Sequence, residues 1–213
     1  MKLCLDFEEA RQTVMLDRDD AINTVFSGKK TLSDLASHEK WKWTSKPVAA
    51  LQIAGITLFS LALHAWYWNQ LPDRVATHFG IDGRPNDWMN KGYATALLCG
   101  IQVAMPLFLF GIGSLLQYIP SSMINIPHRE YWLHADRREQ TIEHVSKMLA
   151  WIAVLTSLEM MAIGHLTFLA NRTGSPLNAP LFLTVLGLYL LGVFSLAGRS
   201  FWILRKPGNS ISS

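Results

Sequence analysis

Four long stretches of this chain carry almost no charged residues. Asp, Glu, Lys and Arg are absent from three of them, and the fourth has a single charge, Glu159; the stretches are 47–72, 92–128, 148–171 and 173–198. About 20 apolar residues in a helix cross a hydrocarbon core about 30 Å thick. The pattern therefore predicts transmembrane helices near 47–69, 93–117, 148–170 and 180–202.

The stretches are apolar on every side rather than amphipathic. A soluble fold is the alternative, and it would need a polar face at helical spacing, which residues 181–194 do not show. Helices also satisfy their own backbone groups where lipid offers no partner. We predict an all-α, four-helix polytopic integral membrane protein with a short structured outer loop between its first two helices.

Composition agrees with a membrane location. Of 213 residues, 50% are hydrophobic and 16% are charged, and the mean hydropathy is +0.18, which is more apolar than ordinary globular chains. The formal net charge is +3. Because the basic residues follow the predicted topology, this charge gives no evidence for nucleic-acid binding, and the lipid bilayer is the expected partner.

The basic residues also predict an orientation, since cytoplasmic loops are enriched in Lys and Arg. With a cytoplasmic N-terminus, four basic residues fall outside, namely Arg74, Arg84, Lys91 and Arg172. The other fifteen fall inside: Lys2, Arg11, Arg18, Lys29, Lys30, Lys40, Lys42, Lys46, Arg129, Arg137, Arg138, Lys147, Arg199, Arg205 and Lys206. Both termini are therefore expected in the cytoplasm.

Three segments follow from this topology: a cytoplasmic segment 1–46, a membrane domain 47–204 and a cytoplasmic tail 205–213. Segment 1–46 has eight basic and eight acidic residues and is either a loosely ordered tail or, near 30–43, a short interfacial helix. The first apolar run follows it and is expected to stay as an anchor rather than be removed as a signal peptide. Cys4 inside and Cys99 in a helix offer no extracytoplasmic disulfide.

The loop between the first two helices, 71–88, is dense in turn-forming residues. Pro72 ends the helix, residues 75–79 alternate as a short strand does, and Asp82-Gly83 is a turn signal. Two interpretations stay open. Either the loop is a compact cap whose glycine and prolines serve its geometry, or His78, Asp82 and Asp87 contact a ligand.

The same loop resembles a known family. Leu71-Pro72, His78-Phe79, Gly83, Pro85-Asn86 and Trp88 are similar to the signature of the family catalogued as domain of unknown function sixteen forty-eight, although Asn86-Asp87 stands where Pro-Asp is usual. Further matching elements are Asn125-Ile126-Pro127, Tyr131-Trp132-Leu133, Arg137-Arg138-Glu139 and Ala170-Asn171. The resemblance covers about 47–204 and leaves 1–46 outside.

The resemblance implies a bacterial inner-membrane protein. Some relatives, the SdpI-like proteins, are immunity and signalling factors against a secreted peptide toxin, and many others have no assigned activity. The family therefore supports the architecture more than the biochemical role.

A second set of candidate residues lies within the predicted helices. Glu159 is near the middle of the third crossing, where an ionised carboxylate is costly, so it is expected to be protonated, paired or facing a wet cavity. Counting residues from each helix midpoint places His64, Gln102 and His165 in the outer half. We predict a polar pocket lined by these three residues with Glu159 at its floor, although the rotation of each helix is not fixed by this count. A Glu159 that merely hydrogen-bonds a neighbouring helix is the alternative.

Metal and cofactor sites are not predicted. His64, His78 and His165 would have to converge at about 2.0–2.1 Å from one ion, and spacing alone gives no reason for that. The cytoplasmic residues Tyr131-Trp132-Leu133, Arg137 and Arg138 are either a lipid-contacting surface or a packed elbow that orients the third helix.

Three classes of function remain to be weighed. The leading one is a membrane module that binds or senses an extracytoplasmic peptide or small ligand, or gives immunity to a peptide toxin. The alternative is a small, homo-oligomeric transporter or proton-coupled permease using Glu159. An intramembrane enzyme is disfavoured, because His-Glu-x-x-His, Gly-x-Ser-x-Gly and phosphate-binding Gly-rich motifs are missing.

Overall fold

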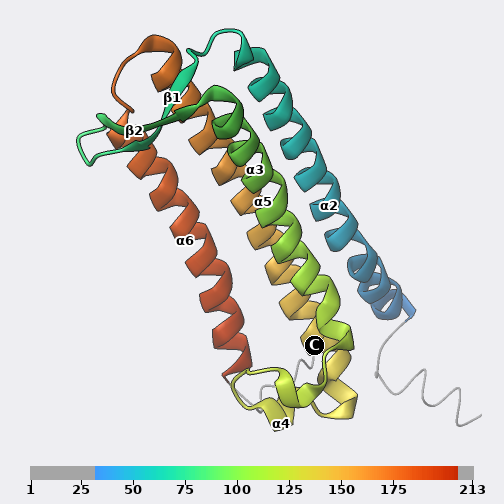
Figure 1. The fold of residues 1–213 in the computed structure, drawn as a ribbon. Helices are drawn as coiled ribbons and strands as arrows, with labels where there is room; N and C mark the ends of the chain where they lie inside the picture. Colours follow the sequence, from blue (N-terminus) through green and yellow to red (C-terminus); the bar gives the residue numbers. More distant parts are fainter. Residues whose placement is uncertain (1–31, 206–213) are drawn as a thin grey trace, which may run out of the picture. The chain divides into compact units, whose positions relative to one another are not determined.

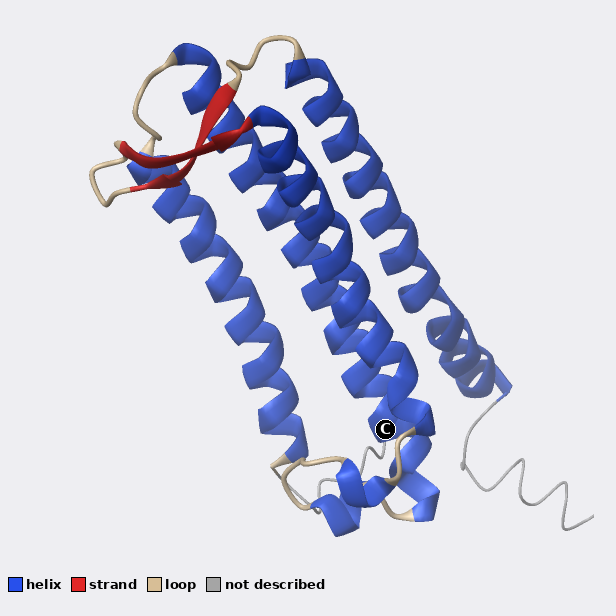
Figure 2. Ribbon diagram, in the orientation of Figure 1, coloured by secondary structure: helices blue, strands red, loops and turns tan. Residues whose placement is uncertain are grey.

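A computed structural model describes the backbone of residues 32–205 and the side chains of residues 46–205 (Figures 1 and 2). The chain separates into two units, Met1–Ser45 and Lys46–Ser213, and the second holds the four membrane spans. The expectations for segment 1–46 and for the tail beyond 205 lie largely outside the described residues.

Four helices make up this unit, and each is long and apolar enough to cross a membrane. They are α2 (Leu32–Trp68, with its membrane span Lys46–Trp68), α3 (Lys91–Leu115), α5 (Ala135–Thr173) and α6 (Ala179–Leu204). Successive helices run in opposite directions, so the α2–α3 and α5–α6 connections meet at one end, called the hairpin end below (Figure 1). The α3–α5 connection, which contains the short helices η1 (Leu116–Tyr118), η2 (Ser121–Met123) and α4 (Arg129–Trp132), lies at the other end, the α4 end.

The helices confirm the predicted four-helix fold. Their membrane spans begin and end close to the predicted residues, because hydropathy and charge mark both limits of a span. The largest difference is α5, which starts at Ala135. The good helix formers of 135–146 run without a break into the third crossing, which lengthens this helix beyond the predicted span.

The loop between α2 and α3 is a β-hairpin. Strand β1 (Arg74–Phe79) pairs antiparallel with β2 (Pro85–Asn90), and the register shifts between Ala76 and His78. The structured loop between the first two membrane helices is thus confirmed, and β2 is an addition that the sequence did not suggest. The turn closes through the Gly80 carbonyl, which accepts the Gly83 N–H at 2.9 Å, while Gly83 takes a φ of 76°.

Two apolar clusters hold α2, α3 and α5 together. The hairpin-end cluster consists of Tyr67, Leu71, Val75, Ala94 and Phe168. The aliphatic cluster, nearer the α4 end, consists of Ala49, Ile53, Ala150, Ala153 and Val154. Small side chains at 49, 150 and 153 permit close helix contact, as is usual between membrane helices.

Helix α6 is most deeply buried at the α4 end. Its only buried residues are Ser200 and Leu204. The Trp132 indole N–H donates to the Leu204 carbonyl at 2.6 Å, and His144 Nε2 lies 2.7 Å from the Ser200 hydroxyl. This arrangement leaves the hairpin-end half of α6 with a largely exposed surface.

Candidate ligand-binding site

The hairpin is fixed to the end of α5 by Asn171. The Ala76 N–H donates to Asn171 Oδ1 at 2.5 Å, and Asn171 Nδ2 donates back to the Ala76 carbonyl at 2.9 Å. The same amide nitrogen donates to the Thr167 carbonyl. The Asn171 amide therefore makes the pair of main-chain hydrogen bonds that a neighbouring strand would make at Ala76. Ala76 lies next to the register shift of β1.

The tip of the hairpin is attached to the α5–α6 connection. The Leu177 N–H donates to the Gly83 carbonyl at 2.8 Å. A Cβ at Gly83 would lie only 2.3 Å from the Leu177 carbonyl oxygen. Glycine is required here both by the positive φ and by this close approach.

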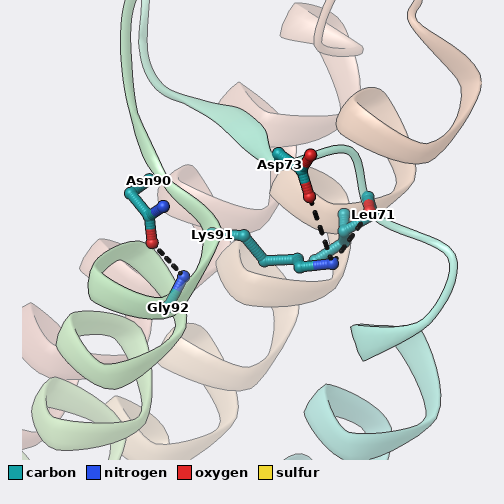
Figure 3. Close-up of polar contacts among 5 residues, drawn as sticks. All are labelled: Leu71, Asp73, Asn90, Lys91 and Gly92. Carbon is teal, nitrogen blue, oxygen red and sulfur yellow. Dashed lines mark hydrogen bonds and ion pairs between the residues drawn. The ribbon is translucent and has the colours of Figure 1, made fainter.

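The base of the hairpin is held by polar contacts around Lys91, at the start of α3 (Figure 3). Its ammonium group donates to the Leu71 carbonyl at 3.4 Å, lies 4.0 Å from Asp73 and stands 5.1 Å from the centre of the Trp68 ring. Asn90 caps α3 by accepting the Gly92 N–H at 2.8 Å. Three attachments thus set the position of β1 over the helix ends.

Beneath β1 lies a cavity of about 490 Å³, called the groove below. Its walls are the hairpin, α5 and the hairpin-end part of α6, and it is lined by Thr77, His78, Phe79, Gly80, Ile81, Ile163, Thr167, Leu177, Ala179, Phe182 and Leu183. The volume is within the range of small-molecule sites, about 300–1,000 Å³. The lining contains no Asp, Glu, Lys or Arg, so it suits an apolar ligand with a few hydrogen-bonding groups.

His78 is the polar residue of the groove best suited to recognition. Its Nδ1 lies 2.6 Å from Asn86 Oδ1, and an amide oxygen only accepts, so Nδ1 carries the proton. In the neutral ring, Nε2 is then left as a hydrogen-bond acceptor. The side chain is exposed, which makes this atom available to a ligand.

Asp82 and Asp87 serve the local backbone of the hairpin. Asp82 Oδ1 accepts the Arg84 N–H at 3.0 Å, and Asp87 Oδ1 accepts the Trp88 N–H at 2.8 Å. Neither lines the groove. The two carboxylates therefore support the turn and the strand, whereas His78 lines the groove.

His64 and Gln102 are buried within the helices, at two different levels. His64 packs edge-on against Phe168 with ring centres 4.5 Å apart, and a Cβ at Gly164 would lie 3.3 Å from its Cε1. Gln102 Nε2 donates to the carbonyl of Ser157 at 3.3 Å. Gly164 and Ser157 are seven residues apart, which is about 10 Å along α5, so the two side chains face the same side of α5 at separate depths.

His165 is exposed rather than part of a buried pocket. Its Nδ1 lies 3.3 Å from the Tyr67 hydroxyl. Tyr67 in turn stacks on Phe168, with ring centres 5.7 Å apart and planes 16° from parallel. His165 therefore meets the His64 region only through these two aromatic rings.

Glu159 is buried on the side of α5 that faces α6. One turn before it, Thr156 Oγ1 lies 3.2 Å from the Tyr189 hydroxyl of α6. One turn after it, Ile163 lines the groove. Ser157 and Glu159 are separated by about 200° around the helix, so Glu159 belongs beneath the groove and not beneath Gln102.

Among residues 46–205, no group of three or more His, Cys, Asp or Glu side chains is arranged to hold a metal ion. His64, His78 and His165 have the separate neighbours described above. No metal role is assigned to them.

Several residues that position the site were not singled out from the sequence as functional. Asn171 stands out in the sequence only through the family resemblance, and no sequence pattern marks Thr167 or Tyr67 as contact residues. An Asn at the end of an apolar span was the one available signal, because a buried amide needs partners. Its partner, Ala76, lies 95 positions away and has no sequence signature.

The residues of the α4 end form a packed elbow. Besides the Trp132 contact with α6, Thr141 donates to the Trp132 carbonyl at 2.9 Å. Arg138 donates to the Ile119 carbonyl at 2.8 Å and so caps η1. Arg137 lies over the Tyr131 ring, 4.3 Å from its centre. These contacts favour the elbow interpretation over a lipid-contacting surface.

Four membrane-length helices, with a β-hairpin fixed across the ends of α3, α5 and α6, define a multi-pass membrane protein with a capped groove. Residues 55–103 match the family model described as Domain of unknown function (DUF1648), which confirms the resemblance over the end of α2, the hairpin and the first half of α3. Comparisons with curated proteins and with solved structures gave no match.

Proposed function

We propose that this protein is a binding or sensing module of the bacterial cytoplasmic membrane, which captures an extracytoplasmic ligand in the groove beneath the hairpin. The excess of basic residues at the α4 end supports an orientation with that end and both termini in the cytoplasm. The hairpin end then faces outward.

The single observation that carries the proposal is the groove itself. It lies directly under the loop for which ligand contact is one of the two interpretations of the sequence, and it is bounded by α6 residues with high exposure, such as Leu183. Ile81 at its rim is 100% exposed. A ligand with an apolar segment can therefore reach the groove along the membrane surface.

A secreted amphipathic peptide is the ligand class that fits best. Its apolar side chains would occupy the uncharged lining, and a hydroxyl or amide N–H would donate to His78 Nε2. Capture at this position would hold such a peptide at the membrane surface before it inserts, which is an immunity function and agrees with the resemblance to SdpI-like proteins.

The test is to fill the groove without disturbing the fold. Cells expressing Ile163→Trp are challenged with a panel of purified secreted peptide toxins, and growth and dye leakage are compared with the wild type. Leu158→Trp, on an exposed position of the same helix, is the matched control. Loss of protection with Ile163→Trp alone supports the proposal, whereas equal protection by a stably folded Ile163→Trp protein contradicts it.

Glu159 favours a second candidate, a small oligomeric proton-coupled transporter. This carboxyl is 4% exposed, its Oε1 has no hydrogen-bond partner, and it lies one turn beneath the groove. Proteoliposomes carrying Glu159→Gln would lose ligand-dependent proton flux while still binding ligand. Unchanged proton flux in Glu159→Gln would contradict a transport function in which Glu159 is the titrating group.

A further inference from the structure

A separate polar feature lies among α2, α3 and α5, between the middle of these helices and the hairpin end. Among residues 46–205, five buried side-chain atoms have no hydrogen-bond partner: Ser60 Oγ, His64 Nε2, Thr95 Oγ1, Gln102 Oε1 and Glu159 Oε1. Glu159 faces α6, as shown above. The other four, on α2 and α3, are called the polar seam below.

The seam occupies two levels of the membrane domain. His64 packs against Gly164, and Gln102 bonds to Ser157, seven residues earlier on α5. Thr95 is likewise seven residues from Gln102 on α3, so these two side chains share one face and are about 10 Å apart. Ser60 is one turn from His64 on α2. Each level therefore receives polar atoms from more than one helix.

The hydrogen-bonding character of the seam is well defined. His64 Nδ1 lies 2.6 Å from the Ser60 carbonyl, so Nδ1 is the donor and Nε2 is the acceptor. Gln102 already donates to the carbonyl and the hydroxyl of Ser157, which leaves Oε1 as an acceptor. The two remaining groups are hydroxyls, which donate or accept. The seam therefore needs small molecules that donate hydrogen bonds.

Apolar side chains close the seam at both ends. Toward the hairpin, Tyr67 and Phe168 stack over the His64 level as part of the hairpin-end cluster. Toward the α4 end, the aliphatic cluster begins at Val154, one turn from Ser157. Unlike the aliphatic layer, the hairpin-end layer contains a polar group. This is the Tyr67 hydroxyl, which reaches His165 at the exposed side of α5.

We propose that the polar seam is an occluded water-binding site in the hairpin-end half of the membrane domain. A buried acceptor without a partner is costly in an apolar setting, and buried waters with two to four polar partners commonly satisfy such groups. Water exchanges through the hairpin-end layer, because Tyr67 supplies a polar group there whereas the opposite layer is aliphatic. The site is independent of the groove, which lies on the α6 side of α5.

Radiolytic hydroxyl-radical labelling of the full chain in nanodiscs tests this directly, because the radicals form from water next to the oxidised side chain. We expect His64 and Tyr67 to be oxidised severalfold more than Phe59, a lipid-facing residue beside Ser60 that is 58% exposed. Labelling in ¹⁸O water then reports the exchange of that water with bulk. His64 oxidation no higher than that of Phe59 would overturn the proposal.

Two pairs of variants separate hydration from simple exposure. Thr95→Val keeps the side-chain volume and removes a hydroxyl, so the oxidation of His64 should fall severalfold. Gly100→Ala, whose methyl group meets open space on α3, should not change it.

Tyr67→Ala should speed the exchange of ¹⁸O water with the seam, and Ile53→Ala should not. Faster exchange in Ile53→Ala alone would contradict access from the hairpin end.

Discussion

The side chain of Asn171 forms hydrogen bonds with both main-chain polar groups of Ala76. These two residues come from opposite halves of the chain, and their contact joins the hairpin to the helix that carries the floor of the groove. The pairing is the geometric basis for placing β1 over α5.

Replacing Asn171 by Ala is expected to loosen the hairpin. Two half-buried main-chain groups of Ala76 would lose their partner, which costs about 1–3 kcal/mol. Thermal unfolding in detergent measures the loss. Thr173→Ala removes a hydroxyl that bonds only within its own helix and should change stability by less than about 0.5 kcal/mol. Equal melting temperatures for the two variants would contradict the role of Asn171.

Gly83→Ala is expected to detach the hairpin tip. The added Cβ would overlap the Leu177 carbonyl, and the positive φ costs an alanine about 1 kcal/mol or more. Limited proteolysis in the turn, followed by mass spectrometry, should then be faster. Gly187→Ala has open space around its new methyl group and serves as the control. Unchanged cleavage of Gly83→Ala would show that the Leu177 contact does not hold the tip.

Gly164→Ala tests the close approach of α2 and α5. Its Cβ would lie 3.3 Å from the His64 ring, so either the ring or the helix must shift, and such overpacking costs about 1–3 kcal/mol. We expect a lower melting temperature for Gly164→Ala than for Gly55→Ala, whose methyl group meets nothing within 4 Å. A lower melting temperature for Gly55→Ala than for Gly164→Ala would contradict the packing of His64 against Gly164.

His78→Ala is expected to weaken ligand binding without affecting the fold. The side chain is exposed and its described hydrogen bond stays within the hairpin, so stability should change by about 0.5 kcal/mol or less. Loss of one hydrogen bond to a ligand corresponds to about 1 kcal/mol, or roughly a fivefold weaker affinity. Asp87→Ala, opposite His78 in the register, is the matched variant. Protection against toxin is measured for both variants. A greater loss of protection in Asp87→Ala than in His78→Ala would contradict the role of His78 in recognition.

Trp132→Phe should release the end of α6. The indole N–H is buried and bonds to the Leu204 carbonyl, so its loss leaves that carbonyl unpaired at a cost of about 1–3 kcal/mol. Hydrogen exchange of the last turn of α6 is the measurement, with Trp151→Phe, on the half-exposed face of α5, as the control. Similar hydrogen exchange of the last turn of α6 in both variants would show that the Trp132 hydrogen bond does not anchor this end of the helix.

The spans of the four helices could be predicted from the sequence, because a change from charged to apolar residues is a local property that marks where a span begins. Strand β2 could not, since Pro85, Asn86 and Asp87 have poor strand propensity and pair only because the Gly80–Gly83 turn brings them beside β1. Its existence depends on a tertiary contact.

The predicted pocket illustrates the same limit. Counting residues gives the depth of a side chain in a helix but not its direction. Gln102 and Glu159 were expected to share a pocket, yet Gln102 bonds to Ser157, and two further residues turn α5 by about 200° toward α6. His64 and Gln102 lie among α2, α3 and α5, whereas Glu159 lies beneath the groove. Only packing between helices fixes these rotations.

Helix α6 has a mechanical consequence that follows from how it is attached. Its buried residues and its contacts with Trp132 and His144 are near the α4 end, while the chain just before it is tied to the hairpin through Leu177. A ligand that widened the groove would therefore tilt α6 about its contact with Thr156 at Tyr189, and the longer arm of the helix is the one that ends at Leu204. Ligand binding in the groove, on one side of the membrane, would then displace the packed elbow of the α4 end on the other side.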